Sequence, residues 1–273
     1  MTPIRPKFSN PPLIERAVTI VFENLDALSL GDYGRFWSEI EIDFPVSEAR
    51  PSVEPDLEAF GAPQRMQPHI QLVAEDAIPR AFFRNPDLGE LIQVQPNRFS
   101  FNWIKSSDDH AYPHSEAVLE RFFALFAKFT EYVDKRQLGK IVPIQCELTN
   151  VNVVAVNDVG ESFPDVATVI RLPDLEAGYD CIRLENQMFG AKHFMLGDDG
   201  APIGRVHSVG QPTLQVETGE PAFRLDIVAR GAPLGGDMAG VSKFFDRAVS
   251  AVNAVFLASV TNAGRQFWGE RNG

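Results

Sequence analysis

The sequence predicts an α+β fold, in which two long helices pack on one face of a curved antiparallel sheet whose opposite face is polar. Three observations indicate this fold. The chain contains a two-faced hairpin, two long amphipathic segments, and the same order of elements in each half of its 273 residues. That order is strand, variable segment, several strands and long helix, over 17–137 and again over 144–268. We predict one domain, 1–273, and the matching order favours an internal duplication.

The hairpin over 91–103 carries the clearest local pattern. Pro96 and Asn97 form its turn, which sets Gln95 opposite Arg98. Because side chains alternate across a strand, one face of the hairpin is apolar and buried. The other is open surface or the floor of a groove. The apolar face comprises Ile92, Val94, Phe99, Phe101 and Trp103, and the polar face comprises Gln93, Gln95, Arg98, Ser100 and Asn102.

Periodicity and turn residues assign the remaining elements. We expect strands over 17–22 and 78–84, a helix over 30–44, and a proline-rich irregular connection over 45–77 with a short strand near 69–73. The second half is expected to contain strands over 144–156, 181–188, 192–196, 212–217 and 222–230.

Both long helices have wide apolar stripes. The first is expected to begin near Ser115 as N-cap and to run to Arg136, with Phe122 and Phe129 in a stripe wide enough to be gripped by a sheet. The second is expected over 241–260, and the tail over 261–268 extends it.

Composition restricts the class of partner. A net charge of −12 argues against nucleic acid and against an anionic membrane as partners. The N-terminus lacks the apolar core of a secretory signal, and no apolar run is long enough to span a bilayer, so we expect a soluble cytoplasmic protein. Cys146 and Cys181 lie in apolar, strand-like contexts and are expected to be small buried residues, with a disulfide between them as the alternative.

Several stretches taken together resemble a known family. They are NPPLIE at 10–15, the hairpin at 91–103, QCELTNVN at 145–152 and FWG at 267–269. Together they resemble a sporadically distributed family of bacterial proteins of about this length with no assigned function, and the Gln-x-Gln…Arg-Phe…Asn-Trp hairpin is the most specific part. The chain departs from the family at Asn97 and Asn150. The resemblance implies that the hairpin and the strand of Glu147 form one centre, and a patchy distribution is typical of mobile or defence-associated genes.

The candidate binding site consists of fork-shaped donors and paired acceptors suited to a polar ligand or a peptide segment. Arg98 could bind a carboxylate or phosphate, and Glu147 could bind an amine. In the alternative, Arg98 and Glu147 pair with each other across neighbouring strands and the amides face water. The predicted site residues are Gln93, Gln95, Arg98, Ser100, Asn102, Glu147, Asn150 and Asn152.

Catalysis, metal and phosphate sites have weaker support. The chain has no GxSxG elbow, and an acid–base enzyme would rely on Glu147 and Glu185. The run 108–110 with His114 offers metal ligands, but acids before a helix also serve the helix dipole. The glycine-rich loop over 231–243 has the setting of a phosphate cradle, yet Asp237 lies where the anion would sit. We predict no catalytic residue, no metal and no cofactor.

These observations favour a non-enzymatic protein that binds a protein or a small polar ligand, without nucleic acid or membrane. The binding surface would be the polar face around Arg98, Asn102 and Glu147, or an exposed tail around Trp268. The first alternative is a hydrolase or transferase that acts on a small polar substrate through paired carboxylates. The second is an assembly protein that acts through a homodimer interface, suggested by 21 phenylalanines.

Overall fold

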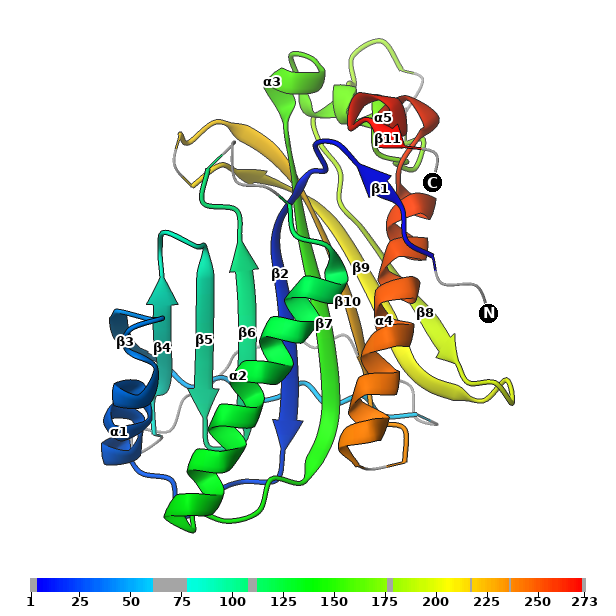
Figure 1. Ribbon diagram of the computed structural model, residues 1–273. Coiled ribbons are helices and arrows are strands. Elements are labelled where there is room, and N and C mark those ends of the chain that lie inside the picture. Colours follow the sequence, from blue (N-terminus) through cyan, green and yellow to red (C-terminus); the bar gives the residue numbers. More distant parts are fainter. Residues whose placement is uncertain are drawn as a thin grey trace. The chain divides into compact units, whose positions relative to one another are not determined.

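The structure is a computed structural model, and it describes residues 4–60, 78–107, 112–175, 179–216, 218–235 and 237–271. Nine strands of this part of the chain form one open antiparallel sheet in the order β3-β4-β5-β6-β2-β7-β10-β9-β8 (Figure 1). With the helices, this sheet confirms the α+β class. The strands are β1 (Lys7–Phe8), β2 (Leu13–Phe22), β3 (Val46–Arg50), β4 (Arg80–Asn85), β5 (Glu90–Gln95), β6 (Arg98–Ile104), β7 (Pro143–Ala155), β8 (Phe189–Leu196), β9 (Pro202–Leu214), β10 (Pro221–Gly231) and β11 (Glu270–Arg271). The helices are α1 (Leu30–Ile40), α2 (Ser115–Arg136), α3 (Val156–Val159), the 3-10 helix η1 (Phe163–Thr168), α4 (Met238–Ser259) and α5 (Asn262–Phe267).

The chain divides into two compact units. Unit 1 comprises Met1–Arg16, Thr149–Ala229 and Asp246–Gly273, and unit 2 comprises Ala17–Leu148 and Arg230–Phe245. Four elements, β2, β7, β10 and α4, contribute residues to both units. The single domain and its duplicated halves remain predictions.

In unit 2, the hairpin β5–β6 has the register predicted from the sequence. Gln95 pairs with Arg98, and Ile92 pairs with Phe101. The predicted apolar face is buried, and the ring of Phe99 lies 5.2 to 6.1 Å from three phenyl rings of α2. Helix α2 therefore packs on the apolar face of this hairpin, as predicted.

The long helix α2 runs over the predicted residues, although its cap differs. His114 is the N-cap and Ser115 is the first helical residue. At the other end Gln137 adopts a left-handed conformation, with φ 54°, and the amide of Leu138 donates to the carbonyl of Val133. This turn ends the helix at Arg136. The shorter α1 ends at Ile40, earlier than predicted.

The connection over 45–77 is only partly irregular, which corrects the sequence prediction. Its residues 46–50 form β3, which pairs with β4 from Val46 opposite Arg84 to Arg50 opposite Arg80. This strand shows no alternation of apolar and polar residues because it lies at the edge of the sheet with every side chain at least partly exposed. Residues 61–77, which include the strand predicted near 69–73, lie outside the described part.

In unit 1, two of the expected strands are wrong or misplaced. Residues 181–188 form no strand, and their side chains are mostly exposed. The 13-residue β9 begins at Pro202 and takes in only the start of the strand predicted over 212–217. Its glycines conceal the strand pattern in the sequence. At Gly210 a Cβ atom would clash with the ring of Phe189 on β8, so a larger residue there would have to displace that ring.

The C-terminal tail does not extend α4, and its tryptophan is buried although neighbouring residues such as Phe267 are exposed. Thr261 caps the separate helix α5 by accepting a hydrogen bond from the amide of Gly264. Trp268 is 4% exposed, and its ring lies 6.1 Å from that of Phe256. Trp268 itself is therefore a core residue, and the alternative binding surface around it remains a prediction that would rest on its exposed neighbours such as Phe267.

Two further findings concern cysteines and membranes. Both cysteines are free thiols, with Cys146 buried as expected and Cys181 exposed, contrary to expectation. No helix in the described part of the chain combines the length and the apolar character that crossing a bilayer requires.

We expect Phe99→Ala to lower the free energy of unfolding by about 3–5 kcal/mol, because it leaves a cavity beneath three phenyl rings of α2. Urea unfolding would measure this change. The matched control is Phe267→Ala, whose ring is 52% exposed and whose loss should cost under about 1 kcal/mol. Equal costs for the two variants would contradict the packing described for α2.

Asp32 holds the start of α1 through its carboxylate. One oxygen accepts from the amide and hydroxyl of Ser29 at 3.0 and 2.6 Å, and the other accepts from the hydroxyl of Tyr132 at 3.0 Å. Burial acts to raise the pKa of Asp32, but the hydrogen bonds from Ser29 and Tyr132 outweigh it and hold the pKa below its ordinary value.

A depressed pKa in the folded state means that the charged form stabilises the fold above about pH 4, and that this stability is lost as the pH falls through the folded pKa. Asp32→Asn retains an acceptor oxygen but no charge. We expect it to lower the free energy of unfolding by about 1–2 kcal/mol at neutral pH, with the deficit shrinking as the medium becomes more acidic than the ordinary carboxyl pKa. Urea unfolding across this range would test it, and a deficit independent of pH would contradict the role of the charge.

Candidate functional site

Three of the five polar residues of the hairpin are buried, although we expected this face to face water or a groove. Gln95, Ser100 and Asn102 are only 2 to 3% exposed. Residues 51–60, which we call the strap, have no regular secondary structure and pass across unit 2 on the face away from α2 (Figure 1, light blue). The strap therefore covers part of the surface that the sequence marked as a binding face.

Gln95 holds the strap through the main chain of one residue. Its Oε1 accepts from the amide of Val53 at 2.9 Å, and its Nε2 donates to the carbonyl of Val53 at 2.9 Å. The same Nε2 donates to Oδ1 of Asn97 in the hairpin turn at 3.1 Å. Asn97 thus orients the Gln95 amide, which pairs with the strap as a neighbouring strand would.

Gln145 on β7 repeats this arrangement further along the strap. Its Oε1 accepts from the amide of Glu58 at 2.8 Å, and its Nε2 donates to the carbonyl of Asp56 at 2.9 Å and to Oε1 of Glu147 at 2.8 Å. Gln145 is not among the site residues predicted from the sequence. Its position two residues before Glu147, and hence on the same face of a strand, was the signal that could have found it.

Ion pairs near Gln95 and Gln145 add to the contacts with the strap. Nη2 of Arg98 lies 3.4 Å from Oε1 of Glu147, so this predicted ion pair forms, with β2 between the two strands that carry it. Arg230 on β10 pairs with Asp56 of the strap, and its Nε lies 3.8 Å from Glu147. Glu147 therefore anchors two arginines and one glutamine. The alternative in which the amides face water does not hold for Gln95.

The other predicted hairpin residues bond to one another and to neighbouring strands. Gln93 donates to Oδ1 of Asn102 and accepts from Nη1 of Arg80, each at 2.8 Å. Ser100 accepts from the hydroxyl of Thr19 on β2 at 2.7 Å. These groups form a polar layer beside Gln95 and Gln145. We call those two glutamines the glutamine clamps.

The two predicted asparagines have partners in unit 1. Asn150 accepts from Nε of the buried Arg16 at 2.9 Å, and Asn152 donates to the carbonyl of Leu225 at 3.0 Å. Both lie an odd number of residues from Glu147, and side chains alternate along a strand. The spacing itself therefore argues against a common face with Glu147, and both amides satisfy internal groups.

The reactive side chains near the clamps are engaged or protonated. Burial, together with the charge of Glu147, raises the pKa of Cys146 to about 12, so its thiol is a poor nucleophile at neutral pH. Glu147 is 7% exposed and already accepts from Gln145 and Arg98. Glu185, its proposed acid–base partner, is exposed in unit 1 outside any strand. The paired-carboxylate enzyme remains a prediction.

The weaker candidates from the sequence gain no support. In the described ranges no cluster of three or more His, Cys, Asp or Glu side chains is placed to hold a metal ion, and residues 108–110 lie outside those ranges. Asp237 accepts a hydrogen bond from the amide of Gly240 at 2.7 Å. Its carboxylate thus occupies the start of α4, where a phosphate would have bound.

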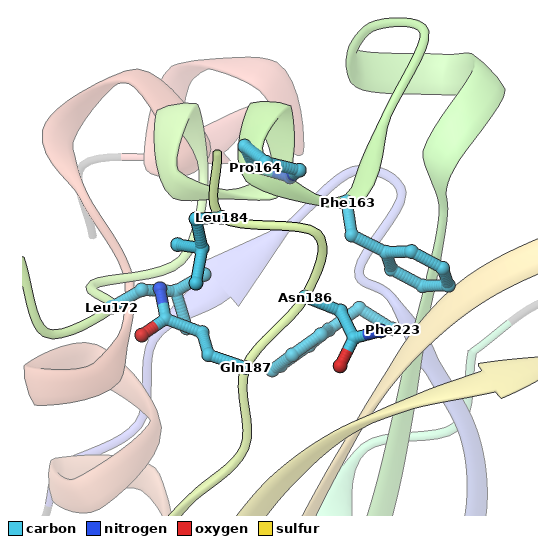
Figure 2. Close-up of a pocket in the computed structure, with 7 residues that line it drawn as sticks. All are labelled: Phe163, Pro164, Leu172, Leu184, Asn186, Gln187 and Phe223. Atoms are coloured by element: carbon cyan, nitrogen blue, oxygen red, sulfur yellow. The ribbon is translucent and has the colours of Figure 1, made fainter. Parts of the chain in front are cut away.

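Two concavities lie elsewhere. A groove of about 680 Å³ runs along α2 in unit 2, with apolar walls that include Phe123, Phe126 and Ile141. Figure 2 shows a recess in unit 1 between η1, residues 184–187 and Phe223, but it has no room for a water molecule. Neither contains a residue of the predicted site.

Comparison with known proteins adds no identification. No protein-family model matches the chain, and no curated protein is similar to it. One solved structure that it resembles is described as the crystal structure of the di-domain ARO/CYC StfQ from the steffimycin biosynthetic pathway. The two are 8% identical over 93% of this chain and 97% of that one, with a TM-score of 0.19. A likeness this weak supports no argument about fold or function.

We expect Gln95→Ala to accelerate hydrogen exchange at the Val53 amide by about tenfold, the effect of losing one hydrogen bond. Gln145→Ala should have the same effect at the Glu58 amide. Hydrogen–deuterium exchange of peptides that cover the strap would measure both. Gln93→Ala is the matched control, because Gln93 bonds to Arg80 and Asn102 and not to the strap. An unchanged rate at Val53 in Gln95→Ala would contradict the clamp.

Proposed function

We propose that this chain is a non-enzymatic, cytoplasmic binding protein whose polar sheet face in unit 2 holds an extended peptide segment. In the free protein that segment is the strap, residues 51–60 of the same chain. In function it is a segment of a partner protein that takes the place of the strap. The resemblance of the hairpin to a patchily distributed bacterial family adds a mobile-element or defence-associated context to this proposal.

The observation that carries the proposal is the use of side-chain amides to bind main chain. Gln95 and Gln145 each present one acceptor and one donor to the backbone of the strap. Every residue except proline offers the same amide and carbonyl groups. A face with two such clamps therefore recognises an extended backbone and accepts many sequences, as binding sites that add a strand to a sheet do.

The strap itself is weakly anchored, which favours exchange. None of its residues is fully buried, and its largest apolar side chains, Leu57 and Phe60, are 49% and 43% exposed. Apolar burial thus contributes little to its attachment. Within the described ranges the contacts that hold it include the hydrogen bonds to the clamps and the pair of Asp56 with Arg230. Segments with few buried apolar contacts open at low free-energy cost.

The test empties the face and offers the segment in trans. In the linker variant, residues 52–58 are replaced at equal length by glycine and serine, with Val53→Pro and Glu58→Pro. The two prolines remove the amides that donate to Gln95 and Gln145, so the tethered segment no longer satisfies the clamps. A labelled peptide of residues 51–60 should bind this variant, as measured by fluorescence anisotropy. Wild type should bind it at least about tenfold more weakly, because a tethered strap competes at an effective concentration in the millimolar range.

Gln145→Ala in the linker variant is the control, and it should bind the labelled peptide more weakly than the linker variant alone. If the linker variant proves unstable, Asp56→Ala provides a milder one that removes only the pair with Arg230, and it should bind the peptide with intermediate affinity. Absence of binding up to about 1 mM, in a linker variant with a cooperative thermal transition, would overturn the proposal.

A further inference from the structure

Beside the clamps lies a row of positive charge. Three arginines and one clamp face the same side of neighbouring strands. Arg50 pairs with Arg80 across β3 and β4, and Gln95 pairs with Arg98 across β5 and β6. The pairing of Ala81 with Val94 places Gln95 in the position next to Arg80. The row across the four strands is therefore Arg50, Arg80, Gln95 and Arg98. The Cβ atoms of neighbouring residues in such a row lie about 5 Å apart.

The carboxylates around this row are committed elsewhere or shared. Glu147 forms an ion pair with Arg98 and also accepts a hydrogen bond from Gln145. Glu48 forms ion pairs with Arg50 and Arg84. Arg80 has no acidic partner among the described residues. Its contacts there are the Gln93 side chain and the ring of Phe82, whose centroid lies 4.7 Å from its guanidinium carbon. The row itself thus contains three arginines and no carboxylate, in a chain of net charge −12.

Two buried nitrogens in the row lack an acceptor. The Nε atoms of Arg80 and Arg98 are inaccessible to solvent and make no hydrogen bond within the described part of the chain. Burial, together with the charges of Arg98 and Arg50, lowers the pKa of Arg80. An unsatisfied buried donor and the unopposed charge of Arg80 both cost free energy, and a carboxylate would remove both costs.

The path of the strap locates the missing carboxylate. The strap leaves β3 after Arg50 and reaches the Gln95 clamp on β5 at Val53. Residues 51 and 52 therefore span the width of β4, the strand that carries Arg80. The strap places Pro51 and Ser52 there, and neither is acidic. Further along, its acids alternate at Glu54, Asp56 and Glu58, and Asp56 already pairs with Arg230.

We infer that the partner segment is acidic and carries a carboxylate side chain at the position of Ser52, where it pairs with Arg80 and Arg98. This inference rests on the proposed function, because it names the chemistry of the segment that replaces the strap. The strap supplies the acids of the second half of such a segment and lacks the one in the first half. A missing acid would let a partner with the full set displace the strap.

The test compares two peptides on the linker variant, each spanning residues 51–60. One carries Glu and the other Gln in place of Ser52, so they match in size and differ in charge. The Glu peptide should bind about tenfold more tightly, the usual size of one charge-assisted hydrogen-bonded pair. The advantage should vanish in Arg80→Gln and decline with added salt. Arg84→Gln is the control, since Arg84 pairs with Glu48 and lies outside the row.

The outcomes separate the two claims. If both peptides bind with equal affinity, the clamps work and the inference about the acid is wrong. If neither binds, the proposed function itself fails. A measurement within the intact chain is independent of peptide binding. Ser52→Glu should raise the midpoint of thermal unfolding relative to Ser52→Gln, and the difference should disappear when Arg80→Gln is combined with each.

Discussion

The hydrogen bonds between two glutamine side chains and the backbone of the strap determine how the polar sheet face of unit 2 is covered. A polar sheet face can be buried only if its donors and acceptors find partners. Gln95 and Gln145 find theirs in the strap, and each is oriented by a neighbour, Asn97 and Glu147. With that face covered, residues 18–22 of β2 can be buried on both sides.

The two faces of the hairpin consequently have different kinds of cover. Helix α2 covers the apolar face with phenyl rings, whose packing around Phe99 depends on shape. The strap covers the polar face with main-chain groups and with the pair of Asp56 and Arg230. The first cover contributes most of the stability, because apolar burial scales with area. The second contributes less and is therefore the one that can be exchanged.

Local patterns predicted the elements whose packing follows from their own residues. The hairpin register followed from alternation around a two-residue turn, and the bounds of α2 followed from its apolar stripe. Edge strand β3 and glycine-containing β9 lack such a pattern and were missed. Covering of the polar face could not be predicted, because the partner of Gln95 is an irregular segment 42 residues away that has no periodicity. Pairing of Arg98 with Glu147 was foreseen because opposite charges on one face attract.

The geometry of the clamps also restricts how this protein can diverge. Glutamate in place of Gln95 would keep the acceptor for the Val53 amide but lose both donors, and it would set a carboxylate against a backbone carbonyl. Asparagine is one methylene shorter and would not reach the backbone from the same strand. The strap has the opposite freedom, since only its backbone is read at Val53. Relatives of this chain should therefore retain both glutamines, whereas the residue types between Pro51 and Phe60 should vary.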